Sequence, residues 1–379
     1  MRRFCAVAVA LAVVLLPSAA IAAPPASGSP SPFQGPSPFQ GPSPFQGPSP
    51  FQGLSPSWSL SPTGSTARLR GLSVVSARVV WAGGSGGTVL RTVDGGRHWA
   101  SVGPAGAEAL QFRDIEAFDA RRAVVLSIGP GADSRVYRTV DGGRTWAETF
   151  RNPDAAAFYD CLAFTDARHG LALSDPVDGA FRVLSTSDGG QTWAVRSRVR
   201  MPAALTGEFA FAASGTCLVA GADGRYWFAT GGGATARVFT TTDHGRSWRV
   251  TSTPVPSGPS AGIYSLAFRS PSQGVAVGGD YAAPSSAPSG AAVLRDGRWT
   301  TSAVPPGEYR SGAAWIPGRR ASVLAVGPTG SSLSHDGGHT WTEFDGGSFD
   351  TADCVTSRNA PVCWASGETG RLAILNGRF

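Results

Sequence analysis

The stretch RTVDGGRHW at residues 91–99 decides the fold, because related nonapeptides recur along the chain. Four further near-complete copies are RTVDGGRTW (138–146), STSDGGQTW (185–193), TTTDHGRSW (240–248) and LSHDGGHTW (333–341). Two shorter relatives, LRDGRW (294–299) and LNGRF (375–379), complete a set of seven. Self-similarity of this kind is the sequence signature of a repeat architecture.

The spacing of the seven copies predicts seven structural units. The steps between them are 47, 47, 55, 53, 40 and 40 residues, measured at Asp94, Asp141, Asp188, Asp243, Asp296, Asp336 and Asn376. A period of about 40 to 50 residues with short alternating strands suits a four-stranded propeller blade. We therefore predict an all-β fold, a seven-bladed β-propeller of four-stranded antiparallel blades.

Each full copy predicts a tight turn between the last two strands of a blade. The aspartate can accept hydrogen bonds from its own turn, and the glycines supply positive φ values. The tryptophan begins the outer strand and can pack across the blade. Regular repetition favours a structural role for these residues, which are Asp94, Trp99, Asp141, Trp146, Asp188, Trp193, Asp243, Trp248, Asp336 and Trp341.

The ring also needs to close. The last copy stops at Phe379, so the seventh blade lacks its outer strand. The segment WSLS at residues 58–61 is similar to the outer strands that follow Trp193 and Trp248. We predict that this N-terminal strand completes the seventh blade and hides a sheet edge.

The N-terminal region predicts export. Arg2 and Arg3 precede an apolar run at residues 6–16, and small residues at 20–22 suit a signal peptidase, with cleavage near Ala22. The run is too short to span a bilayer. We expect a signal peptide (1–22), a Pro/Ser/Gly-rich linker with SPFQG repeats (23–56) and the propeller (57–379), secreted or held in the periplasm or at the cell surface.

Four cysteines remain after removal of the signal peptide. Cys354 and Cys363 flank a predicted hairpin and are the candidate disulfide pair in an oxidising compartment. Cys161 and Cys217 could bridge adjacent repeats, which the sequence leaves open. No cysteine or histidine spacing is typical of a metal site, and no dinucleotide fingerprint is present, so we expect neither metal nor cofactor.

The nonapeptides resemble the Asp-boxes, or BNR repeats, of a family that includes bacterial sialidases and many other secreted propellers. The first copy, together with the preceding WAGG strand at 81–84, is similar to photosystem II assembly factor-like propellers. This resemblance covers roughly residues 58–379. In that family an arginine-rich face recognises a polypeptide partner, so the resemblance implies a binding face here.

That face should lie opposite the aspartate turns, where the innermost strands begin. Aligning the apolar residues of these strands gives one position per blade, namely Arg70, Arg113, Tyr159, Thr206, Ile263, Arg310 and Asp350. Their neighbours Asp114, Asp160, Glu208, Tyr264, Tyr309 and Asp353 should lie close by. We predict a binding patch made of Arg70, Arg113, Tyr159, Arg310 and Asp350. Arginine pairs with planar anions in fork geometry, which suits an anionic ligand. The alternative is that the arginines pair with Asp114, Asp160 and Asp350 and only line a solvated channel.

The preferred function is an exported, monomeric, non-catalytic scaffold that binds a protein or glycan partner with anionic groups. The formal net charge of +6 does not indicate nucleic acid as the partner. The alternative is a secreted glycoside hydrolase, which needs two carboxylates around the scissile bond. Candidates in the expected loops are Asp175, Asp178, Asp280 and Glu368. A sialidase would be six-bladed and carry an Arg-Ile-Pro motif, which this chain lacks.

Overall fold

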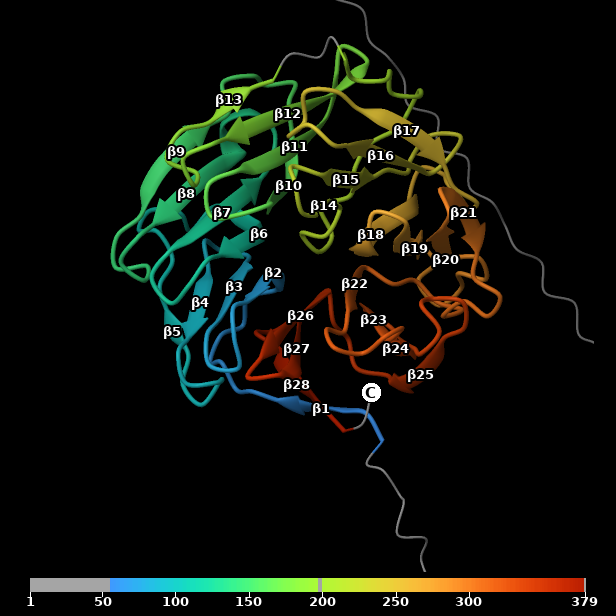
Figure 1. The fold of residues 1–379 in the computed structure, drawn as a ribbon. Helices are drawn as coiled ribbons and strands as arrows, with labels where there is room; N and C mark the ends of the chain where they lie inside the picture. Colours follow the sequence, from blue (N-terminus) through green and yellow to red (C-terminus); the bar gives the residue numbers. More distant parts are fainter. Residues whose placement is uncertain (1–54, 197–199, 378–379) are drawn as a thin grey trace, which may run out of the picture. The chain divides into compact units, whose positions relative to one another are not determined.

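The computed structural model describes residues 55–196 and 200–377. Their strands form seven four-stranded antiparallel sheets around a central axis (Figure 1). The predicted seven-bladed propeller is therefore confirmed. The predicted signal peptide and all but the last two residues of the predicted linker lie outside the described residues.

The first four blades follow the sequence from the innermost strand outward. Blade one contains β2 (Leu69–Val74), β3 (Val80–Gly84), β4 (Val89–Thr92) and β5 (Ala100–Ser101). Blade two contains β6 (Gln111–Ala117), β7 (Ala123–Ile128), β8 (Arg135–Thr139) and β9 (Ala147–Arg151), with the 3-10 turn η1 (Gly131–Asp133) between β7 and β8. Blade three contains β10 (Tyr159–Phe164), β11 (Gly170–Val177), β12 (Ala180–Thr186) and β13 (Ala194–Val195). Blade four contains β14 (Leu218–Ala220), β15 (Tyr226–Ala229), β16 (Arg237–Thr241) and β17 (Arg249–Ser252).

The remaining three blades complete the ring. Blade five contains β18 (Ala261–Ser270), β19 (Gln273–Asp280), β20 (Ala291–Arg295) and β21 (Arg298–Thr301). Blade six contains β22 (Gly312–Trp315), β23 (Val323–Gly327), β24 (Gly330–Ser334) and β25 (Thr342–Asp345). Blade seven contains β26 (Thr351–Ser357), β27 (Ala360–Ser366), β28 (Leu372–Asn376) and β1 (Ser57–Leu60).

The hydrophobic core lies between neighbouring blades. Successive side chains of a strand point to opposite faces, and each blade is covered on both faces by its neighbours. A middle strand such as β7 is therefore apolar and buried at consecutive positions from Ala123 to Leu126. One core cluster joins Val124 of blade two to Phe164 of blade three.

The aspartate turns, which are the segments around Asp94, Asp141, Asp188, Asp243 and Asp336, share one hydrogen-bond pattern. In the first, Asp94 Oδ1 accepts hydrogen bonds from the Thr92 hydroxyl at 2.8 Å and from the His98 amide at 3.0 Å. The Thr92 hydroxyl in turn accepts from the Gly96 amide at 3.0 Å. Gly96 has a φ of +82°, a conformation that favours glycine. The same contacts recur in the other four turns.

Arginines on third strands tie these turns to the preceding blade. Arg91 donates to the Gly142 carbonyl at 2.8 Å, and Arg138 donates to the Gly189 carbonyl at 2.9 Å. Each bond joins one blade to the turn of the next. These hydrogen bonds therefore hold neighbouring blades together at the turns.

The N-terminal strand closes the ring as predicted. β1 pairs with β28 in antiparallel register, from Ser57 opposite Asn376 to Leu60 opposite Ala373. Its Trp58 indole donates to the Ser331 hydroxyl of blade six at 2.9 Å. The first and last segments of the described chain thus share one sheet, which protects the edge of β28.

The described residues contain two disulfides. Cys354 and Cys363 face each other on β26 and β27. Cys161 on β10 is joined to Cys217, which precedes β14, so this bond links blades three and four. None of the helical turns in the described residues is long and apolar enough to cross a membrane.

Candidate functional site

The topology brings the starts of all innermost strands to one end of the ring. In an antiparallel four-stranded blade, the start of the first strand and the loop between strands two and three lie at the same end. The turn between strands three and four lies at the other end. The aspartate turns and the residues that precede each innermost strand therefore occupy opposite ends of the propeller.

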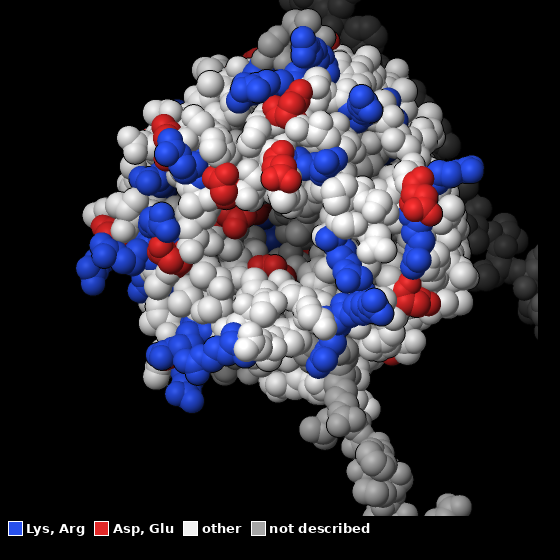
Figure 2. Space-filling view, in the orientation of Figure 1, with Lys and Arg blue, Asp and Glu red and all other residues white. Residues whose placement is uncertain are grey.

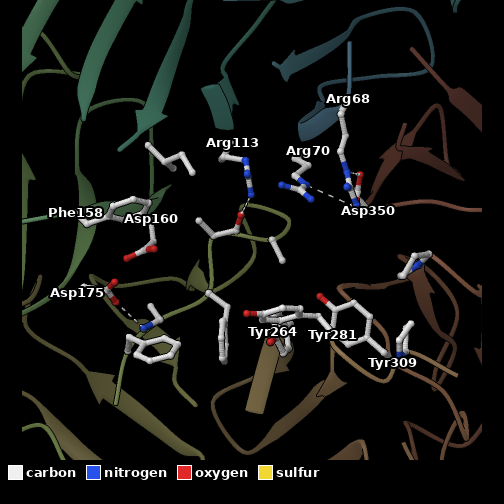
Figure 3. A pocket seen from close by; sticks show the side chains of 18 residues that line it. Arg68, Arg70, Arg113, Phe158, Asp160, Asp175, Tyr264, Tyr281, Tyr309 and Asp350 are labelled. Carbon is white, nitrogen blue, oxygen red and sulfur yellow. Dashed lines mark hydrogen bonds and ion pairs between the residues drawn. The ribbon is translucent and has the colours of Figure 1, made fainter. Parts of the chain in front are cut away.

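A cavity of about 620 Å³ opens among these strand starts. We call it the funnel. It is lined by Arg68, Arg70, Arg113, Phe158, Asp160, Asp175, Phe209, Phe211, Tyr264, Tyr281, Tyr309 and Asp350, with smaller residues between them. In the space-filling view the centre of the ring is hollowed, and both basic and acidic atoms are visible in the hollow (Figure 2). Figure 3 shows the arginines along one side of the funnel and the tyrosines along the opposite side.

β-bulges direct four of these side chains into the funnel. The register between the first two strands shifts at one residue in blades one, two, three and five. The residue without a partner is Arg70, Arg113, Asp160 or Tyr264, respectively. A bulge leaves one residue out of the ladder and re-aims its side chain, and bulges are frequent beside active sites.

The floor of the funnel is a segment of blade four that crosses the centre of the ring. We call residues 209–216 the plug. The Ala212 carbonyl accepts from Arg113 of blade two at 2.6 Å, and the Ser214 carbonyl accepts from Thr351 of blade seven at 2.9 Å. Gly215 has a φ of +73°, and a side chain there would meet the Asp114 carboxylate at 2.6 Å. The plug thus lies between the funnel and a second cavity of about 400 Å³, since Ala212 and Ala213 line the first and Ser214 and Gly215 line the second.

Arg68 and Arg70 share one carboxylate on the basic side. Arg68 donates to both oxygens of Asp350, at 2.8 and 2.6 Å, and lies 2.9 Å from Glu368. Arg70 lies 3.6 Å from Asp350, and its buried Nε has no hydrogen-bond partner within the described residues. Burial lowers the pKa of Arg70. Because Asp350 is already engaged by Arg68, Arg70 retains donor capacity toward the funnel.

Arg113 is the second arginine with unused capacity. Its Nη1 donates to the plug at Ala212, and it forms no ion pair among the residues that the structure describes. Burial, followed by the positive charges of Arg70 and Arg68, lowers the pKa of Arg113 to about 10. The guanidinium still carries its charge at neutral pH, and a ligand anion would relieve the repulsion among the three arginines.

The opposite side of the funnel is aromatic. Tyr264 stacks on Phe211 of the plug at a centroid distance of 4.0 Å and meets Tyr309 edge-on at 4.7 Å. Tyr281 lies at the rim with 56% of its surface exposed. Tyrosines offer apolar area together with a hydroxyl, which is why they are enriched where proteins bind each other. This wall can therefore contact uncharged parts of a partner.

The acidic wall of the funnel belongs to blade three. Asp160 lies at the bulge of β10, and Asp175 lies on the neighbouring strand β11 (Figure 3). Asp175 Oδ1 accepts from the Ala210 amide of the plug at 2.9 Å. Burial raises the pKa of both carboxyls, and the neighbouring charge of Asp175 adds to the rise at Asp160. Both carboxyls therefore favour the protonated form more than exposed aspartates do.

Three predicted patch residues, Arg70, Arg113 and Asp350, line the funnel. Two predicted residues lie outside it and are replaced by a neighbour in sequence. Tyr159 is fully buried between blades against Phe150, since the bulge falls one residue later, at Asp160.

Arg310 is the second correction. It is fully buried, and its guanidinium donates to the hydroxyls of Thr329 at 3.0 Å and Ser332 at 3.1 Å. The preceding residue, Tyr309, lines the funnel in place of Arg310. A strand alternates its side chains between two faces, so an error of one residue moves a side chain from the funnel to the core.

The alternative expectation, that the arginines pair with Asp114, Asp160 and Asp350, holds only for Asp350 among the described ion pairs. Asp350 pairs with Arg68 and Arg70. Asp114 instead accepts the Leu162 amide of blade three at 2.6 Å, so it joins neighbouring blades. Among the candidate hydrolase carboxylates, Asp175 lines the funnel and Glu368 contacts Arg68.

Sequence reasoning missed Arg68, Tyr281 and the plug as parts of the site. Tyr264 and Tyr309 were expected only as neighbours of the aligned positions, and a test of the alternate strand phase could have placed them in the patch. No group of three or more potential metal ligands occurs in the described part of the chain.

Comparison with known proteins shows a shared fold. No protein-family model matches the chain, and no curated protein matches it in sequence. A solved structure described as YCF48 bound to D1 peptide matches with a TM-score of 0.60 and 14% identity, covering 86% of this chain and 98% of that one. YCF48 from Cyanidioschyzon merolae matches with a TM-score of 0.58 and 17% identity, over 84% and 98% of the two chains.

A propeller from another group matches nearly as well. The WD40 β-propeller domain of Doa1 gives a TM-score of 0.55 and 12% identity, over 84% of this chain and 97% of that domain. Such low identities establish the propeller fold, and fold does not by itself define function.

Proposed function

We propose that this protein is an exported, non-catalytic scaffold whose funnel binds a peptide segment of a protein partner through an anionic group. The observation that carries the proposal is the state of Arg70 and Arg113. Both are largely buried and line one cavity. Arg70 has only a 3.6 Å contact with Asp350, which Arg68 already engages, and Arg113 forms no ion pair within the described residues. Buried charges of this kind are stabilised by an opposite charge, which the ligand would supply.

The shape of the funnel supports a peptide as the ligand. Its volume of about 620 Å³ is within the usual range for ligand pockets, and its floor and one wall are aromatic and apolar. A peptide side chain with a carboxylate can reach the arginines while its neighbours contact the tyrosines. The structural match to a propeller described as bound to a peptide agrees with this mode of binding.

Export is supported by the chemistry of the cysteines. The bonds Cys161–Cys217 and Cys354–Cys363 account for every cysteine in the described residues. Disulfides persist in oxidising compartments outside the cytoplasm. This agrees with the signal peptide expected at residues 1–22.

The funnel favours binding over glycoside hydrolysis. A hydrolase needs two carboxyls with different tasks, one protonated as the acid and one ionised as the base or nucleophile. Burial shifts the pKa of Asp160 and of Asp175 in the same direction, so their surroundings do not mark one as the acid and the other as the base or nucleophile. The wall lacks the divided environment that acid–base catalysis requires.

The test is a selection from a randomised 12-residue peptide library, displayed on phage, against the mature chain. We expect enrichment of peptides with aspartate or glutamate. For synthetic peptides of the enriched sequences, Arg113→Ala should weaken binding about 10- to 100-fold, the usual value of a charge-assisted hydrogen bond. The matched control is Arg249→Ala, which removes an exposed arginine from the outer strand β17.

Two results would contradict the proposal. One is a selection without enrichment, and the other is equal binding of the enriched peptides to the parent protein and to Arg113→Ala. Oligosaccharides containing uronic acids serve as a parallel probe. Tighter binding of these, lost in Arg113→Ala, would assign the funnel to a glycan. Turnover of fluorogenic glycosides that is lost in Asp175→Asn would assign it to a hydrolase.

A further inference from the structure

The acidic wall of the funnel has one oxygen that the protein leaves unused. Asp160 is 2% exposed, and its Oδ2 is buried with no hydrogen-bond partner in the described part of the chain. The residue lies at a bulge that turns it toward the cavity it lines. A buried polar atom without a partner costs free energy, so such atoms are rare in native proteins and call for an explanation.

The surroundings of Asp160 do not supply a cation. The nearest opposing charge is Arg113 on β6, which is directed to the plug carbonyl of Ala212 and forms no ion pair with Asp160 within the described residues. From β11, Asp175 adds a second negative group. Glu208, which precedes the plug, is fully engaged by Arg237 of β16. The wall therefore presents two carboxyls and no resident counter-ion.

Aromatic rings flank the two carboxyls. Phe158 precedes Asp160, and Phe209 at the start of the plug lines the same cavity. Figure 3 shows Phe158, Asp160 and Asp175 grouped on one side, away from the Arg68–Asp350 pair. Carboxylates beside aromatic rings form a favourable site for an ammonium or guanidinium group.

We propose that Asp160 and Asp175 form a subsite for a cationic group, so that the funnel selects peptides with a lysine or arginine side chain near the anionic residue. This inference rests on the proposed peptide-binding function and narrows its ligand class. The arginine side of the funnel takes the anion, and the acidic wall takes the cation. A bipolar ligand would satisfy Asp160 Oδ2 and the free donors of Arg70 in one binding event.

The subsite has a pH signature. A cation can pair with the wall only after the carboxyls release protons, and burial has raised their pKa. Binding of a permanent cation should therefore strengthen as pH rises from 5.5 to 8 and should release protons into the buffer. Binding of an uncharged analogue should not change with pH in this way.

The experiment uses benzylamine as the probe and benzyl alcohol as its uncharged match. Both are titrated into the mature full chain and followed by NMR, at pH 5.5 and pH 8. Benzylamine is protonated at both pH values, so only the protein changes its charge. We expect benzylamine to bind about tenfold tighter at pH 8 than at pH 5.5, and benzyl alcohol to bind weakly at both.

Three variants locate the effect. Asp160→Asn and Asp175→Asn keep the shape of each side chain and should remove the preference for benzylamine together with its pH dependence. Asp280→Asn is the matched control, because it neutralises a carboxylate at the corresponding loop of blade five that does not line the funnel. A thermal melt of each variant checks that it is folded.

The outcomes separate this inference from the proposed function. Benzylamine that binds no better than benzyl alcohol, or equally well to Asp160→Asn, overturns the cation subsite. Benzoate, titrated in parallel, probes the arginine side. Benzoate binding that is lost in Arg113→Ala while benzylamine fails would keep the anion site and reject only the subsite. The reverse result would reject the anion site alone.

Discussion

The two ends of the propeller use aspartate in opposite ways. At the end with the aspartate turns, hydrogen bonds from the Thr145 hydroxyl and amide lower the pKa of Asp141 to about 2. At the funnel end, burial raises the pKa of Asp160 and Asp175. The residue type is the same, so the difference comes from the donors around it. The turn offers several donors to one carboxylate, whereas the acidic wall offers Asp160 burial without enough partners.

Regularity distinguishes the two ends as well. The five aspartate turns repeat one pattern of contacts, and each fastens a blade locally. At the funnel end the corresponding positions differ from blade to blade, with Arg70, Arg113, Asp160 and Tyr264 at the bulges. A feature that every blade needs is repeated, while a feature that only a ligand needs appears once. The turns therefore stabilise the blades, and the proposed binding is confined to the funnel.

The largest effect is expected from the disulfide that fixes the plug. Changing Cys161 and Cys217 to alanine removes a link across 56 residues and should cost about 4 kcal/mol of unfolding free energy. The matched pair Cys354→Ala with Cys363→Ala spans 9 residues and should cost about 2 to 3 kcal/mol. Guanidinium denaturation of both variants measures the difference. An equal loss would show that the funnel end does not depend on covalent anchoring of the plug.

The next largest effect is a difference in unfolding free energy between variants of two arginines at the funnel end. Arg310→Ala should cost about 3 kcal/mol, because it empties a fully buried position and leaves the buried hydroxyl of Ser332 and the half-buried hydroxyl of Thr329 without their donor. Arg113→Ala should change the unfolding free energy by less than about 1 kcal/mol, since it also removes repulsion from Arg70. Urea denaturation compares the two. A larger loss in Arg113→Ala would make that residue structural and weaken its assignment to the ligand.

A smaller effect is expected at the aspartate turns. Asp243→Ala removes the acceptor for the Ser247 amide and hydroxyl and should cost about 1 kcal/mol, because water can replace part of these bonds. Asp243→Asn keeps one oxygen acceptor and should cost less. Peptide binding should be unchanged in both, as measured by fluorescence anisotropy. A clear loss of binding would connect the turns to the funnel and break the comparison.

The most gradual effect is the pH dependence of stability. Carboxyls with a raised pKa, such as Glu116, which burial raises to about 8, bind more protons in the folded chain, so stability should fall as pH rises from about 4 toward 8. Carboxylates with a lowered pKa, such as Asp141, should lose their contribution as pH falls from about 4 to 2. Each carboxyl can contribute at most about 1.4 kcal/mol per pH unit to its slope.

Thermal melts from pH 3 to pH 8 measure both slopes. Glu116→Gln should flatten the alkaline side only, and Asp141→Asn should flatten the acid side only. A stability maximum at pH 7 or above in the parent protein would contradict the opposite roles given to the two sets of carboxyls.

Local patterns were enough to predict the fold. Seven copies of one turn gave the number of blades, and the missing outer strand of the last copy identified residues 57–60 as the closing strand. Turn geometry depends on neighbouring residues, so these features can be recognised from short stretches of sequence. The same logic placed Arg70, Arg113 and Asp350 near one end.

The residues that line the funnel could be identified only from the tertiary structure. A bulge shifts the strand phase by one residue, which moved the site from Tyr159 to Asp160, and the plug brings Phe211 beside Tyr264 from another blade. Neither event leaves a local pattern in the sequence. The sequence by itself determined the ring, its blade number and its closure, because the repeated turns and the missing outer strand can be recognised in short stretches of sequence. Only the tertiary structure decided which side chains face the funnel and what charge they carry, because burial and partners come from different blades.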